Sequence, residues 1–269
     1  MDEEAVDAAV TLDILQARYA AMLQNVQNLP EIVMKGAAVE GVVKDLPVDE
    51  AVWCLDQLIR GALWGDEPAM EAMLATSMWL IHSRERDDYD LFKSLFEAAY
   101  TAERKAVVYL LRDAPPQLSL TKGKRLPEVR LPLQRDVSVG ERRMLAAGPQ
   151  RQFLERLLLD SNPLVIRKLL GNPHLRQQDV LIVATRRPTT PELLLEVALA
   201  VRWFQNSTIR EALALNPFSR TGLVLKILPS LHIRALRMLA FSGDLHPLVS
   251  ESARLLVELR EERTAPWRV

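Results

Sequence analysis

A seven-residue pattern that recurs in the second half of the chain constrains the fold more than any other feature. It runs from a small residue or Pro, through a β-branched residue, to an apolar residue four positions later. Its three copies are Pro163-Leu-Val165-Ile-Arg-Lys-Leu169, Ser207-Thr-Ile209-Arg-Glu-Ala-Leu213 and Pro247-Leu-Val249-Ser-Glu-Ser-Ala253. The second and third copies begin 40 residues apart. Helical repeats of about 40 residues stack side by side, because each repeat buries its apolar face only against its neighbours. The spacing therefore predicts tandem helical repeats from about residue 138 onward.

The first two copies each run into an Asn-Pro pair, and these pairs, Asn172-Pro173 and Asn216-Pro217, lie 44 residues apart. Asn tolerates the left-handed or turn backbone that ends a helix, and Pro prevents the helix from continuing. We interpret the recurring Asn-Pro pair as helix punctuation and not as a catalytic feature.

Composition agrees with an all-α fold. The chain has 269 residues, of which 49% are hydrophobic and 26% are charged, and only 10 are Gly. Ala, Leu, Val, Arg and Glu dominate, a mixture that favours helices over sheets. We expect an all-α protein, with an α-solenoid of HEAT-like repeats following an N-terminal helical region.

Charge divides the chain into two halves. Residues 1–120 carry 10 Lys and Arg against 21 Asp and Glu, whereas residues 121–269 carry 24 against 14, giving net charges of −11 and +10. We expect an acidic N-terminal helical region at 1–113, a Pro-rich basic linker at 114–136 and a basic repeat domain at 137–269. Such asymmetry indicates either two separate roles or an acidic half that docks on a basic one.

Local signals place the helices. Apolar spacing predicts about six helices within residues 4–112, and further helices at 177–187, 207–215, 219–228, 231–241 and about 247–263. Ser138 and Glu141 have the spacing of a capping box. Thr190 before Pro191 predicts a hydroxyl cap with Pro in the first turn.

Five segments between about Ser138 and Leu259 resemble bacterial HEAT-like repeat proteins, including the leucine-rich-repeat-variant type. They are Val139-Gly-Glu-Arg-Arg-Met-Leu145, Leu158-Leu-Asp-Ser-Asn-Pro163, Gly171-Asn-Pro173, Ala184-Thr-Arg-Arg-Pro188 and Ala214-Leu-Asn-Pro217. The resemblance implies an α-solenoid but specifies function poorly, because such solenoids serve as scaffolds, adaptors and occasionally enzymes. The variant family's iron–sulfur module needs several cysteines, and this chain has one, so no cluster is implied.

Basic residues recur along the predicted repeats, and stacking could bring them into one stripe. Such a stripe could bind the phosphates of a nucleic acid, pair with the acidic N-terminal half, bind an acidic partner protein, or simply face solvent. The candidate binding residues are Arg167, Lys168, Arg176, Arg186, Arg187, Arg202, Trp203, Arg210, Arg220, Lys226, Arg234 and Arg237.

A more specific form of the nucleic-acid hypothesis is a resemblance to HEAT-like-repeat DNA glycosylases, which handle a damaged base with aromatic and acidic side chains. Trp203 beside Arg202, with Asp179 in the preceding repeat, is the nearest equivalent. No motif is specific enough to transfer catalytic residues, and packing is the favoured interpretation of Trp203.

The sequence offers little for metal or covalent chemistry. His82, His174, His232 and His246 lie far apart and form no paired ligand motif. Cys54 lies in an apolar helical stretch, which favours a buried thiol. The acidic N-terminus and the lack of a long apolar run predict neither a signal peptide nor a membrane span, so we expect a cytoplasmic protein.

Together these features predict a non-enzymatic scaffold or adaptor that binds another protein through a helical-repeat surface, with no metal and no cofactor. Nucleic-acid binding through the arginine stripe is the alternative, and base-excision chemistry is a distant third.

Overall fold

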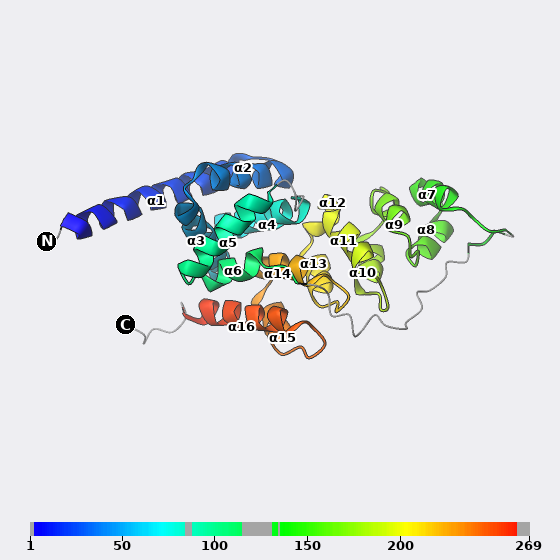
Figure 1. Ribbon diagram of the computed structural model, residues 1–269. Coiled ribbons are helices and arrows are strands. Elements are labelled where there is room, and N and C mark those ends of the chain that lie inside the picture. The colour runs from blue at the N-terminus through cyan, green and yellow to red at the C-terminus, as the bar shows by residue number, and fades with distance from the viewer. Residues whose placement is uncertain (1–2, 84–87, 115–130, 134, 263–269) are drawn as a thin grey trace. The chain divides into compact units, whose positions relative to one another are not determined.

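Helices account for all the regular secondary structure in the computed structural model, which describes residues 3–83, 88–114, 131–133 and 135–262 (Figure 1). Side chains are described from residue 12 onward. Across these ranges the chain forms sixteen α-helices, one short 3-10 helix and no strand, which confirms the all-α class. None of the described helices combines the length and apolar character that crossing a membrane requires.

The chain divides into two compact units. The first contains residues 1–112 together with 254–269, and the second contains residues 113–253. The expected linker at 114–136 falls mostly outside the described residues.

Six helices form most of the first unit, as the apolar spacing predicted. They are α1 (Glu3–Asn28), α2 (Ile32–Asp45), α3 (Val48–Trp64), α4 (Glu67–His82), α5 (Tyr89–Thr101) and α6 (Lys105–Leu111). The last part of α16 (Pro247–Glu262) also belongs to this unit, and Trp64 Nε1–H donates a hydrogen bond to the Leu259 carbonyl at 3.2 Å.

Helix α4 lies at the centre of the first unit and packs against α1, α2 and α3. Two glycines allow the close approach. A Cβ at Gly36 on α2 would lie 3.1 Å from the Ala75 carbonyl oxygen, and one at Gly61 on α3 would lie 2.8 Å from the Ala69 Cβ. Both glycines therefore serve close helix packing.

The second unit is built from shorter helices. They are α7 (Val139–Ala147), α8 (Arg151–Leu157), α9 (Pro163–Leu170), α10 (Gln177–Thr185), α11 (Pro191–Leu199), α12 (Val201–Phe204), α13 (Ser207–Ala214), α14 (Thr221–Ile227), η2 (Leu228–Ser230), α15 (Ile233–Ala240) and the start of α16. Helices of this length are not stable alone in water. Their stability therefore comes from packing: α7 lies against α9, α9 against α11, α10 against α11 and α13, and α13 against α14.

Side-chain hydrogen bonds cap the N-termini of several of these helices. Ser138 and Glu141 form the expected capping box at α7. Asn162 accepts a hydrogen bond from the Leu164 N–H at 2.9 Å, and Asn206 accepts one from the Thr208 N–H at 3.0 Å. The expected hydroxyl cap at Thr190 is wrong, because its side chain makes no cap hydrogen bond, although Pro191 does begin α11.

The recurring Asn-Pro pairs do more than end a helix. The side-chain amide of Asn172 donates to the Ala146 and Gly148 carbonyls, each at 2.8 Å. Asn216 donates to the Ala184 carbonyl at 2.7 Å and to the Arg186 carbonyl at 3.2 Å. Neither Asn has the left-handed backbone that we considered, since the positive φ values among the described residues belong to other positions. Each buried Asn instead satisfies carbonyls at the end of a helix some 24 to 32 residues earlier.

Candidate functional site

Three of the candidate binding residues lie in the core of the second unit. Arg186, Trp203 and Arg210 are all less than one-tenth exposed. The Arg186 guanidinium donates to the Leu158 and Asp160 carbonyls at 3.1 to 3.2 Å, beyond the end of α8. These bonds satisfy carbonyls that a helix terminus leaves without partners.

Arg210 and Trp203 serve other helix ends in the same way. Arg210 donates to the Phe204 and Gln205 carbonyls, each at 2.8 Å, and burial lowers the pKa of its guanidinium to about 10. Trp203 Nε1–H donates to the Leu170 carbonyl at 2.8 Å, which agrees with the favoured packing interpretation. These side chains therefore hold the fold and present no cationic or aromatic surface.

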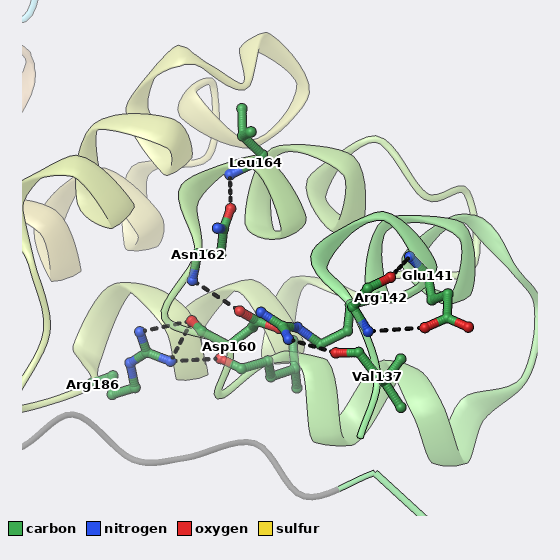
Figure 2. A network of polar contacts seen from close by, with 9 residues as sticks. Val137, Glu141, Arg142, Asp160, Asn162, Leu164 and Arg186 are labelled. Atoms are coloured by element: carbon green, nitrogen blue, oxygen red, sulfur yellow. Dashed lines mark hydrogen bonds and ion pairs between the residues drawn. The ribbon is translucent and has the colours of Figure 1, made fainter. Parts of the chain in front are cut away.

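Asp160 connects the end of α8 to α7 and α9 (Figure 2). Its carboxylate accepts a hydrogen bond from Arg142 Nε at 2.7 Å and another from the Asn162 backbone N–H at 2.8 Å. Its backbone carbonyl accepts from Arg186. The side chain of Asp160 is almost fully buried, so the network is structural.

Three further candidates are exposed but have partners within the second unit. Arg167 holds Glu196 through two hydrogen bonds of 2.6 and 2.8 Å, which raises the pKa of the Arg167 guanidinium. Arg220 lies 3.5 Å from Glu192, and Arg187 donates to the Leu215 carbonyl at 2.6 Å.

The remaining candidates lie at or near the surface. Lys168, Arg176, Arg202, Arg234 and Arg237 are exposed, and Lys226 is half-buried. The Arg202 guanidinium stacks 4.3 Å above the Trp203 ring, and Lys226 Nζ lies 3.5 Å from the Gly222 carbonyl oxygen. The sequence left open whether the basic residues form one stripe, and the structure places some of them in the core of the second unit and others at or near its surface.

The acidic residue considered for base excision also has a structural partner. The Asp179 carboxylate receives two hydrogen bonds from Arg151, at 2.5 and 2.7 Å, and one from the Arg176 backbone N–H at 2.8 Å. These bonds, chiefly those from Arg151, hold the pKa of Asp179 below its ordinary value. Asp179 and Trp203 are both buried, and neither is presented to a ligand.

A cleft of about 330 Å³ lies between α7 and the end of α9. Arg143 comes from α7, and Leu164, Arg167 and Lys168 come from α9. Lys168 was among the expected binding residues, but Arg143 was not. The adjacent pair Arg142-Arg143 was a basic signal in the sequence, although only the fold shows that Arg142 is held by Asp160 while Arg143 faces the cleft.

Within the described ranges, no group of three or more His, Cys, Asp or Glu side chains could hold a metal ion. Cys54 is buried, as expected, and burial raises the pKa of its thiol to about 11. A thiol with a raised pKa is mostly protonated at neutral pH and is a poor nucleophile.

Comparison with known proteins adds no identity. No protein-family model, no curated protein and no solved structure matches this chain. The HEAT-like resemblance therefore remains a hypothesis based on the repeated sequence segments.

Proposed function

We propose that the second unit is a HEAT-like helical-repeat array that binds another protein and does not itself catalyse a reaction. Repetition of the helix starts supports the repeat assignment. Asn162, Asn206 and His246 each accept a hydrogen bond from the backbone N–H two residues later, at intervals of 44 and 40 residues. The packing of successive helices against one another is also what a repeat array requires.

The protein-binding role is carried by one surface feature at the end of α15. Met238 is 52% exposed and Phe241, three residues later, is 87% exposed. Residues three apart on a helix face the same side, and Phe241 is the C-cap residue that directly follows the last turn of α15. Arg234 and Arg237 are exposed on the same helix, and we call these four residues the α15 patch. Aromatic residues, Met and Arg are the types enriched at protein interfaces, which favours a protein partner for this patch.

Nucleic-acid binding is the competing proposal, and the contacts of the arginines weaken it. Non-specific binding requires many cationic side chains that are available to neutralise phosphates. Arg186 and Arg210 donate instead to buried carbonyls, and Arg167 and Arg220 face carboxylates of the same unit.

Affinity capture with matched variants tests the proposal. The full-length wild-type chain, the double variant Met238→Ser/Phe241→Ser and the control Met34→Ser are used to recover proteins from the native lysate. Met34 is also exposed, but it lies on α2 in the first unit. We expect the same partner to be recovered reproducibly with the wild type and the control, and to be lost with the double variant.

Two results would contradict the proposal. One is the absence of any reproducible partner, and the other is full retention of the partner by the double variant. Binding of duplex DNA at low salt that weakens in Arg234→Glu would favour the nucleic-acid alternative.

A further inference from the structure

The cleft between α7 and α9 has an excess of positive charge. Arg143, Arg167 and Lys168 line it, and Arg167 is paired with the Glu196 carboxylate. Within the described part of the chain, Arg143 and Lys168 form neither an ion pair nor a side-chain hydrogen bond. Arg167 keeps a side chain that is 63% exposed even though it is paired. Two cations are therefore available to a ligand, and a third is partly neutralised.

The rest of the cleft is mainly apolar. Leu164 on α9 is partly exposed, and Ala147 and Pro173 also line the cleft. Asn172 is the uncharged polar side chain of the lining, and its amide is fully engaged by the Ala146 and Gly148 carbonyls. Its side-chain oxygen accepts from the His174 N–H at 2.8 Å. The cleft thus offers apolar contacts together with two available cations.

We propose that this cleft binds an acidic segment of a partner protein, with a carboxylate between Arg143 and Lys168 and an apolar side chain against Leu164. The inference rests on the proposed protein-binding function and specifies the chemistry of the partner. Opposite charges across an interface provide specificity and faster association. The volume, about 330 Å³, is at the small end of ligand pockets and suits one or two side chains.

The apolar lining favours a peptide over a phosphate polymer. A nucleic acid gains most of its non-specific affinity from phosphates contacted along an extended surface. The cleft instead combines the cations of Arg143 and Lys168 with the apolar side chains of Leu164 and Pro173 in a volume of about 330 Å³. A peptide can supply both a carboxylate and an apolar side chain within that space.

Peptide selection on the full-length protein tests the inference. A phage-displayed library of random peptides is selected on the wild type, and the affinities of individual selected peptides are then measured for Lys168→Glu, Arg143→Glu and the control Arg156→Glu. The control makes the same charge change at an exposed arginine on α8, outside both the cleft and the α15 patch. We expect the selected peptides to be enriched in Asp and Glu. Their affinity should fall about tenfold or more for each cleft variant and change little in the control, because like charges brought together repel.

Other results would overturn the inference. Selected peptides without acidic enrichment would do so, as would no selected peptides at all or equal weakening in the cleft variants and the control. Duplex DNA that binds in a Lys168-dependent manner, without acidic-peptide binding, would assign the cleft to phosphate ligands instead. Thermal unfolding followed by circular dichroism verifies that each variant is folded.

The two experiments distinguish failure of the acidic-peptide inference from failure of the proposed protein-binding function. A partner captured through Met238 and Phe241, together with no acidic peptide at the α7–α9 cleft, would leave the function standing and remove only this inference. Acidic peptides that bind the cleft without any partner dependent on the α15 patch would remove the role of that patch and keep the cleft.

Discussion

Arg186 and Arg187 are neighbours in the chain with opposite environments. Arg186 is buried and donates hydrogen bonds to two backbone carbonyls, whereas Arg187 is exposed and donates to one. We predict that Arg186→Ala lowers the free energy of unfolding of the second unit by about 3 kcal/mol, because it leaves buried carbonyls unsatisfied and opens a cavity. Arg187→Ala should cost less than about 1 kcal/mol, because water can replace an exposed donor. Urea unfolding followed by circular dichroism measures both, and equal losses would contradict the structural role of Arg186.

Asp179 provides a pH-dependent test at the same scale. Its pKa in the folded protein is lowered, mainly by the hydrogen bonds from Arg151. A lowered folded pKa adds stability above the unfolded pKa of about 4, and this stability is lost as the pH falls through the folded pKa. Arg151→Gln should therefore cost about 2 kcal/mol at neutral pH, less than a fully buried pair because the Arg151 side chain is 42% exposed.

The difference between Arg151→Gln and the wild type should shrink as the pH falls from about 4 toward the lowered folded pKa of Asp179, because the carboxylate of the unfolded chain is protonated first. Urea midpoints measured across the acidic range test this trend. Glu155→Gln is the control, because Glu155 is an exposed partner of Arg151 on the same helix. It should change stability little. A difference that stays constant with pH would show that Asp179 is not the titrating partner.

At the scale of elements, Asp160, which follows α8, links this helix to α7, α9 and α10. Its carboxylate accepts hydrogen bonds from Arg142 of α7 and from the Asn162 backbone N–H before α9. Its backbone carbonyl accepts a hydrogen bond from Arg186, which follows α10. Asp160→Ala should lower the free energy of unfolding by about 3 kcal/mol, because it removes one partner of a buried ion pair. Glu155→Ala, on the exposed face of α8, should cost less than about 0.5 kcal/mol. Comparable losses in chemical denaturation would contradict this role for Asp160.

Helix positions in the second unit were predictable because their signals are local. Apolar spacing predicted helices at 207–215, 219–228 and 231–241, and the structure has them at Ser207–Ala214, Thr221–Ile227 and Ile233–Ala240. The Ser138–Glu141 capping box was also visible, since both partners lie within one helical turn. A local signal was insufficient at Thr190, where a residue with good capping propensity makes no cap bond.

The roles of the individual polar residues were not predictable, because their partners are distant in sequence. Asn172 binds carbonyls 24 and 26 residues earlier, and Trp203 binds one 33 residues earlier. In sequence, Arg186 is indistinguishable from an exposed arginine, because burial of a guanidinium depends on carbonyls that only the fold supplies. The cleft could not be predicted for the same reason. Lys168 was a candidate binding residue, but only the packing of α7 on α9 places it beside a cleft that Arg143 also lines.

For the whole molecule, the division into two compact units predicts selective destabilisation. Leu58 on α3 and Leu213 on α13 are both fully buried, one in each unit. Replacing either by Ala should cost about 3 kcal/mol. We predict that Leu58→Ala speeds amide hydrogen exchange in α2–α5 by about a hundredfold and leaves α9–α13 protected, and that Leu213→Ala does the reverse.

Hydrogen exchange read by mass spectrometry resolves the two units within one experiment, so each variant is the control for the other. The comparison depends on local opening, which reports the stability of the surrounding cooperative unit and not only that of the whole chain. If each leucine affects its own unit alone, the second unit can be loosened by substitutions around Asp160 or Asn172 while the first stays intact. If either variant deprotects both sets of helices equally, the chain opens as one cooperative body and the two units are not energetically separate.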